Sequence, residues 1–169
     1  MKVSNISFSG AGILLCLAML TGCGSNIIKP ISKDVIGHAT VRNVIVETTS
    51  ATNSDTIAAK VKEAVQKEAQ KELKGDKQVD LKITIDQWSG GTENVLGGSV
   101  TKTLLGSSTQ LSGVVDVVDI NTGEILGKYS IASKHEEGGL MGATKTISFV
   151  DTDKAVIDNF ATYTINHLE

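Results

Sequence analysis

The segment Gln78–Trp88, QVDLKITIDQW, alternates between apolar and polar residues. Its apolar positions are Val79, Leu81, Ile83 and Ile85, and its polar positions are Asp80, Lys82, Thr84 and Asp86. Because successive side chains of a strand point to opposite faces, this pattern predicts a strand with one buried face. Parity places Trp88, the only tryptophan, on the polar face at the strand end. There it is a candidate partner contact or a cover for an edge or loop.

A helix is predicted immediately before this strand, over Ser54–Lys74. Apolar residues recur there at spacings of three and four, namely Ile57, Val61, Ala64, Val65, Ala69 and Leu73. Asn53 or Ser54 can cap the helix, and Asp55 lies in the first turn, where the helix dipole favours negative charge. Gly75 suits the C′ position that ends a helix. The charged residues between the apolar ones predict a solvated face, with a docking surface as the alternative.

Other strands and a second helix are predicted on both sides of this pair. His38–Thr48 is rich in β-branched residues and predicts a strand. Leu111–Ile120 is almost continuously apolar, which is typical of a central strand. The turn Asn121-Thr122-Gly123 joins it to a returning strand at Glu124–Ser133, and Gly123 permits positive φ. A closing helix is expected over Thr152–Leu168, capped by Asp151 or Thr152, and its packing stripe is Ile157, Phe160, Ala161, Thr164 and Leu168.

The order of these elements predicts an α+β fold: a mostly antiparallel sheet of about four strands with two helices packed on it, in the order β-α-β-(β)-β-β-α. Eleven of the seventeen glycines lie between Gly90 and Gly142. They concentrate in Ser89–Gln110, read as a long loop or loose hairpin, and in a second loop at Glu136–Thr146. We expect both segments at one end of the sheet, and long loops of this kind are often functional.

The composition excludes several kinds of function. The net charge is −3, and the basic residues form no stripe along the sequence. Both observations disfavour nucleic-acid binding. Both cysteines, Cys16 and Cys23, precede the predicted domain, so a disulfide framework or a thiolate site there is excluded. Residues 139–146 depart from a phosphate-binding loop because Thr144 replaces its second glycine. The histidines are isolated in sequence. We therefore predict no catalytic residue, metal, cofactor or nucleotide.

The first residues have the pattern of a secretion signal. Ile13–Leu20 is apolar but only eight residues long, too short to cross a bilayer and suited to a signal peptide. Leu20-Thr21-Gly22-Cys23 resembles the lipobox of bacterial lipoproteins, and an ordinary signal peptide with a chance cysteine is the alternative. The resemblance implies cleavage between Gly22 and Cys23 and attachment of lipid, such as diacylglycerol and palmitate, to Cys23.

These boundaries divide the chain into a signal peptide at 1–22, a tether at 23–36 and a single periplasmic domain at 37–169. The apolar residues of the tether, Ile27, Ile28, Ile31 and Val35, could instead pack on the domain. Gly24 follows the cysteine where inner-membrane retention signals carry an acidic residue. By resemblance to enteric lipoproteins, and for a Gram-negative host, this implies the outer membrane, with the domain facing the periplasm.

Motifs along the mature chain add a second resemblance. VDLKITID (79–86) follows a capped helix, VVDVVDINTGEIL (114–126) contains the hairpin turn, and EEGGLMG (136–142) precedes the last helix. With the lipobox, this layout resembles a family of uncharacterised bacterial envelope lipoproteins that carry a domain of unknown function. The resemblance implies a periplasmic location and no established enzyme activity.

The leading hypothesis is a lipid-anchored, non-enzymatic interaction or assembly module at the outer membrane. Its partners would be the membrane, through Cys23, and either another envelope protein or a second copy. Its candidate contacts are Trp88, Leu96, Leu104, Leu105, Leu140 and Met141. The alternatives are a periplasmic hydrolase whose site is scattered in sequence, and a membrane-active or pore-associated subunit that inserts Val95–Leu105 or Leu140–Phe149 into lipid.

Overall fold

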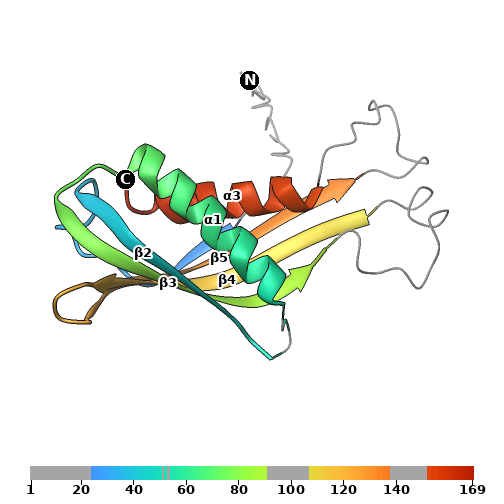
Figure 1. Ribbon diagram of the computed structural model, residues 1–169, viewed down its shortest axis with the longest axis horizontal. Coiled ribbons are helices and arrows are strands. Elements are labelled where there is room, and N and C mark those ends of the chain that lie inside the picture. Colours follow the sequence, from blue (N-terminus) through green and yellow to red (C-terminus); the bar gives the residue numbers. More distant parts are fainter. Residues whose placement is uncertain (1–23, 51, 53, 91–106, 138–151) are drawn as a thin grey trace, which may run out of the picture.

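A computed structural model describes residues 24–50, 52, 54–90, 107–137 and 152–169 of the chain. In these residues one sheet carries two helices on the same face (Figure 1). The elements are β1 Gly24–Lys29, β2 Ala39–Thr48, α1 Asp55–Glu72, β3 Lys77–Ser89, β4 Ser107–Asp119, β5 Ile125–Glu137 and α3 Thr152–Asn166. Neither described helix is both long and apolar enough to cross a membrane.

The strands follow the order β1-β5-β4-β3-β2 across the sheet. Only β2 and β3 pair in parallel, because α1 lies between them in the chain and carries it back to the starting end of the sheet. The other pairings are antiparallel. The predicted α+β class and the mostly antiparallel sheet are confirmed. The sheet has five described strands instead of about four, and β4 is central, as its apolar sequence predicts.

The additional strand lies within the segment predicted as a tether. Gly24–Lys29 pairs with β5, with Gly24 opposite Ala132 and Lys29 opposite Lys128. Residues 30–38 then lead to β2 at the opposite edge of the sheet, and Val35 is fully buried on the way. The alternative stated for the tether is therefore met in part: Val35 and Ile31 pack on the core, whereas Ile27 and Ile28 are exposed. A short exposed edge strand without alternation gives no periodic signal, so its sequence does not distinguish it from a tether.

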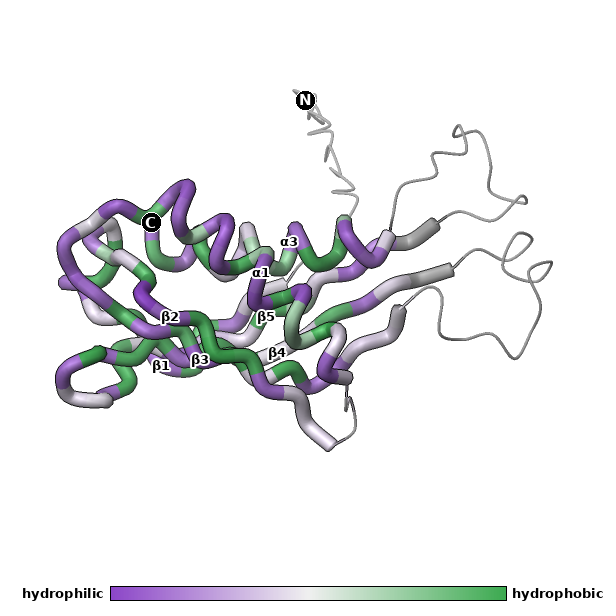
Figure 2. Tube along the Cα trace, viewed as in Figure 1, coloured by the Kyte–Doolittle hydropathy of each residue, from purple (hydrophilic) through white to green (hydrophobic). Residues whose placement is uncertain are grey.

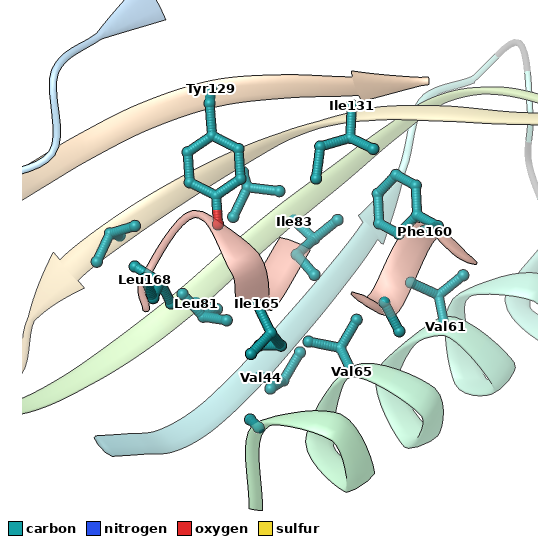
Figure 3. Close-up of a cluster of buried hydrophobic side chains, with 14 of the residues drawn as sticks. Val44, Val61, Val65, Leu81, Ile83, Tyr129, Ile131, Phe160, Ile165 and Leu168 are labelled. Atoms are coloured by element: carbon teal, nitrogen blue, oxygen red, sulfur yellow. The ribbon is translucent and has the colours of Figure 1, made fainter. Parts of the chain in front are cut away.

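The core fills the space between the sheet and the two helices. α1 packs over β2, α3 packs over β5 and β4, and the two helices pack against each other. Figure 3 shows buried side chains converging from the sheet and from both helices, among them Val44, Val61, Val65, Leu81, Ile83, Tyr129 and Phe160. Figure 2 shows hydrophilic residues on the outward side of the helices. The alternation predicted for β3 is confirmed, because its four apolar positions are fully buried.

The start of α1 agrees with the sequence, whereas its end does not. The Ser54 hydroxyl accepts a hydrogen bond from the Ile57 backbone N–H at 3.4 Å, as an N-cap residue should. The helix ends at Glu72, and Leu73 is already extended, with φ −97°. The expectation that Gly75 ends the helix is wrong. A Cβ atom on Gly75 would lie 2.0 Å from the carbonyl oxygen of His38, so this glycine permits a close approach of two backbones.

The position predicted for Trp88 is also wrong. The pairing of β3 with β4 shifts between Ile85 and Gln87, which marks a β-bulge at Asp86. The extra residue reverses the alternation, so Trp88 pairs with the fully buried Leu111 and packs against the core. Trp88 is therefore half-buried on the helix side of the sheet instead of lying on the polar face.

Candidate interaction surfaces

The β1 edge of the sheet is the most exposed strand of the described fold. All six residues of β1 are exposed, and the strand pairs on one side only, with β5; the register shifts between Ile27 and Lys29, which marks a bulge at Ile28. Ile27 and Ile28 are 58% and 53% exposed, more than any other large apolar residue described. Lys29 carries the only charge in the strand and donates a hydrogen bond to the Ile125 carbonyl. An open edge offers backbone donors and acceptors to a partner, and exposed isoleucines add apolar surface.

The β2 edge, at the other side of the sheet, is longer and more polar. Its pairing with β3 shifts at Arg42, which marks a bulge. Asn43 donates to an Asp80 carboxylate oxygen at 3.0 Å, and Arg42 lies 3.6 Å from the same oxygen. Glu47 lies 3.5 Å from the Lys82 Nζ atom. Bulges and charges are features that protect edge strands from uncontrolled pairing.

The sheet face opposite the helices is covered by polar pairs between neighbouring strands. The Lys128 ammonium lies 3.0 Å from an Asp116 oxygen, and Gln110 donates to Gln87 at 3.5 Å. The Ser112 hydroxyl donates to Asp86. Each pair joins side chains on adjacent strands, which is how polar sheet faces are stabilised in water. The polar pairs share this face with the partly buried Val114, Val118 and Ala132.

A groove of about 230 Å³ lies between α1 and α3. It is lined by Lys60, Glu63, Ala64, Lys67, Lys154, Ile157 and Asp158. Lys154 and Asp158 form an ion pair one helical turn apart, so this part of the lining is already neutralised. The groove combines three lysines with two acidic residues, and it has the character of the solvated helix face that the sequence predicts.

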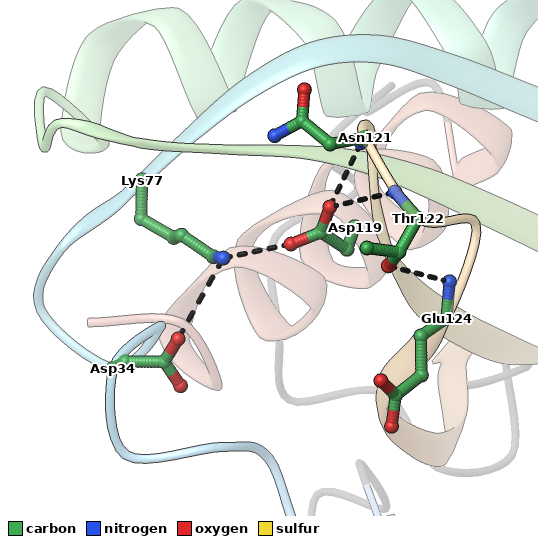
Figure 4. Close-up of polar contacts among 6 residues, drawn as sticks. All are labelled: Asp34, Lys77, Asp119, Asn121, Thr122 and Glu124. Atoms are coloured by element: carbon green, nitrogen blue, oxygen red, sulfur yellow. Dashed lines mark hydrogen bonds and ion pairs between the residues drawn. The ribbon is translucent and has the colours of Figure 1, made fainter.

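A polar cluster lies at the end of the sheet where β3 begins and β4 ends, and it joins three separated parts of the chain (Figure 4). The Lys77 ammonium donates to an Asp119 oxygen at 2.7 Å and lies 3.7 Å from Asp34, in the segment that crosses to β2. The other Asp119 oxygen accepts from the backbone N–H groups of Asn121 and Thr122 at 2.8 and 3.1 Å. The cluster thus fixes the β4–β5 turn and the crossing segment to the start of β3.

These contacts shift the pKa values of the three charged groups. The hydrogen bond from Lys77, followed by those from the Asn121 and Thr122 backbone, lowers the pKa of Asp119 to about 2. The hydrogen bond to Asp119 in turn raises the pKa of Lys77. A hydrogen bond from the Ser32 side chain, with a contribution from Lys77, lowers the pKa of Asp34. The cluster is a structural clamp whose charged forms stabilise each other.

A second set of partly buried polar groups lies where α3 meets β5. The Tyr129 hydroxyl is buried and donates to the Thr164 carbonyl at 2.7 Å, and burial raises the Tyr129 pKa. The His167 ring lies 4.5 Å from the Tyr129 ring, and its pKa is lowered by burial. Within the described ranges, no three His, Cys, Asp or Glu side chains lie close enough together to hold a metal ion.

The structure locates only part of the site predicted from the sequence. Of the predicted contacts, Trp88 lies within the described residues. Because Trp88 is half-buried, only part of its side chain is accessible to a partner. The other predicted residues lie outside the described ranges, namely Leu96, Leu104, Leu105, Leu140, Met141, Gly22 and Cys23. The expectation that both glycine-rich segments meet one end of the sheet is confirmed by the strand ends, since Ser107 pairs with Glu137 and Ser89 with Gln110.

Sequence reasoning missed the edge strand β1 and the Asp119 cluster. Asp119 is followed by Ile120 and then by the turn residues Asn-Thr-Gly, and an aspartate at the start of a turn is a signal for side-chain hydrogen bonds to the turn backbone. The local sequence gives no indication that Lys77 and Asp34 belong to this cluster. Both residues are far from the turn in sequence, and only the folded structure brings them close to it.

Comparison with known proteins gives a fold but no family. No family model and no curated protein sequence matches this chain. PelC from Paraburkholderia phytofirmans, solved as a dodecamer, matches with a TM-score of 0.55 and 7% identity, over 87% of this chain and 98% of PelC. At this identity the match shows a shared fold alone.

Two further structures match less well. A single-residue variant of PelC from the same organism, also a dodecamer, has a TM-score of 0.48 and 8% identity, over 86% of this chain and 97% of the other. A Caulobacter crescentus CB15 protein described as a lipoprotein has a TM-score of 0.33 and 9% identity, over 70% of this chain and 80% of the other. TM-scores this low support no argument.

Proposed function

We propose that this chain is a lipid-anchored, non-enzymatic interaction or assembly module of the bacterial envelope, held at the outer membrane by Cys23. The observation that carries the proposal is the lipobox Leu20–Cys23, which directly precedes the first strand of the folded domain. Two or three acyl chains on one cysteine give durable attachment, because each buried methylene contributes about 0.8 kcal/mol. Gly24, after the cysteine, favours the outer membrane by resemblance to enteric lipoproteins.

The interaction that we favour is self-association. Two features support it. The β2 edge of the sheet is paired on one side only, and an edge strand can extend its hydrogen bonding into a second chain. PelC, which shares the fold, is a dodecamer.

Metabolic labelling with a fatty-acid analogue tests the anchor. Wild-type protein should incorporate the label, and Cys23→Ser should not. Cys16→Ser is the matched control, since Cys16 lies in the predicted leader and its loss should leave labelling unchanged. Undiminished labelling of Cys23→Ser would exclude Cys23 as the acceptor.

Self-association is tested separately by the mass of detergent-extracted protein and by crosslinking in intact cells. Multiples of the chain mass, with crosslinks between copies, are expected. A monomer at micromolar concentration that yields no crosslink to itself or to another envelope protein would contradict an interaction function.

A further inference from the structure

The proposed lipid is attached with almost no linker between it and the folded domain. Cys23 is bonded to Gly24, the first residue of β1, and consecutive Cα atoms are about 3.8 Å apart. If Cys23 is lipidated, as the proposed function requires, Gly24 must lie at the lipid surface. Gly24 is also fixed in the sheet by its pairing with Ala132. The attachment point therefore restricts how the whole domain can be oriented on the membrane.

An orientation with the strands along the membrane normal places charged chain inside the bilayer. Beyond Ala132, β5 continues for five residues to Glu137, which extends about 17 Å. The hydrocarbon core on one side of the bilayer midplane is about 15 Å thick. With this end directed into the membrane, the last residues of β5 would enter the bilayer and would take Lys134 toward hydrocarbon, where an ionised side chain is costly.

The reverse tilt meets the same obstacle. From Ala132 back to Ile125, β5 spans seven residues, or about 24 Å, and this end of the sheet carries the Asp119 cluster. Directing it into the membrane would bury Asp119 and Lys77 in hydrocarbon. Both upright orientations are therefore unfavourable, and the strands must lie roughly parallel to the membrane plane.

Rotation about the strand direction then leaves three surfaces that could face the lipid. The open sheet face carries charged pairs such as Asp116–Lys128, and the helix side carries charged residues such as Lys60 and Lys67. The β1 edge has one charge, Lys29, and it exposes Ile27 and Ile28. Apolar side chains next to a cation suit the boundary between headgroups and acyl chains. The β1 edge is also the surface that contains the attachment point.

We propose that the domain stands on its β1 edge on a phospholipid surface, with Ile27 and Ile28 in the headgroup layer. The strands then run parallel to the membrane, and β5, β4, β3 and β2 follow at increasing height. Four strand spacings of about 4.8 Å place β2 about 19 Å farther from the lipid than β1. In this orientation the β2 edge, with Ile45 at 47% exposure, faces away from the membrane and is available to a protein partner.

Depth-dependent fluorescence quenching tests this orientation on the full lipidated protein. After processing, the only cysteine would be the acylated Cys23, so a single added cysteine can be labelled selectively. The label would be placed at position 26 on β1, 47 on β2, 60 on α1, 128 on the open face or 134 near the far end of β5. The protein would be reconstituted in vesicles of phosphatidylethanolamine and phosphatidylglycerol at three to one, with a quencher on the lipid headgroup or acyl chain.

The expected result is quenching that is several-fold stronger for the label at Asn26 than for the label at Glu47, with lower values at the other positions. Replacing both Ile27 and Ile28 with aspartate should weaken quenching at position 26. The matched change Ile45→Asp on β2 should have no effect there. Strongest quenching at Lys134 would mean that the strands stand upright, and strongest quenching at Lys60 or Lys128 would mean that a face lies on the lipid. Each of these outcomes overturns the proposal.

Vesicle flotation distinguishes failure of this inference from failure of the proposed function. If wild-type protein floats with the vesicles, Cys23→Ser does not, and the quenching is equal at positions 26 and 47, only the edge-on orientation is wrong. If Cys23→Ser floats as well as the wild type, anchoring through Cys23 is wrong and the orientation argument is overturned with it.

Discussion

Replacement of Gly75 by alanine gives the sharpest test of how α1 is joined to the sheet. A Cβ atom at this position would lie 2.0, 2.1 and 2.6 Å from the carbonyl oxygen, carbonyl carbon and Cα of His38. All three are backbone atoms, so no side chain can rotate away. The backbone of Gly75 does not have positive φ, unlike Gly37 and Gly123 among the described glycines. Gly75→Ala should therefore destabilise the fold through a steric clash and not through backbone strain.

The size of the expected destabilisation follows from the contacts that must be broken. To bring the new methyl group to an ordinary distance, the two segments must separate by more than an ångström. The separation would break the hydrogen bonds from Gly75 N–H to the Ala39 carbonyl, 3.0 Å, and from Lys77 N–H to the His38 carbonyl, 2.8 Å. Each contributes about 1 kcal/mol. Overpacking adds roughly 1–3 kcal/mol, which gives a total destabilisation of about 3–5 kcal/mol.

Urea unfolding followed by the fluorescence of Trp88, the only tryptophan, measures this loss. With a denaturant slope of about 2 kcal/mol per molar, the unfolding midpoint should fall by roughly 1.5–2.5 M. Gly24→Ala is the matched control, because a Cβ there meets nothing within 4 Å and the midpoint should not change. Gly123→Ala, at φ +73° in open space, should cost about 1–2 kcal/mol. A midpoint for Gly75→Ala at or above that of Gly123→Ala would refute the reasoning.

Two further predictions concern polar groups of the fold. Tyr129→Phe removes the 2.7 Å hydrogen bond to the Thr164 carbonyl near the end of α3, and it should lower the unfolding free energy by about 1–2 kcal/mol, measured by urea titration. The pKa of Asp119 is lowered from 3.8 to about 2, so its stabilising contribution is complete above about pH 4 and is lost as the pH falls through 2. The urea midpoint of the wild type should therefore fall more steeply between pH 4 and pH 2 than that of Asp119→Asn, and equal slopes would show that Asp119 is not the group responsible.

The sequence predicts the elements of this fold well wherever one side of an element is buried. The burial of the four apolar residues of β3 and of the apolar stripe of α1 can be predicted because these residues recur with periods of 2 and 3.6 residues. The position of Trp88 could not be predicted in this way, because the bulge at Asp86 depends on the pairing with β4. The role of Gly75 could not be predicted either, because the local sequence does not show that the His38 backbone, just before β2, approaches it.

The candidate surfaces are less predictable than the fold. β1 carries no periodic pattern, since all its residues are exposed and its place in the sheet comes from pairing with a strand about 100 residues later. The cluster at Asp119 likewise needs Lys77 and Asp34 to be brought together by β3 and the crossing segment. Contacts between distant parts of the chain leave no local signal, whereas the resemblance of Leu20–Cys23 to a lipobox rests on four adjacent residues.

The position of β1 also has a mechanical consequence. If the lipid on Cys23 holds the domain, any force that lifts the domain from the membrane enters the fold at Gly24, at one end of a six-residue edge strand. A load perpendicular to that strand separates its hydrogen bonds to β5 one after another, whereas a load along it would act on all of them together. The remaining four strands and both helices lie outside this path. Under tension, β1 would therefore detach first, lengthening the connection to the membrane while the core stays folded.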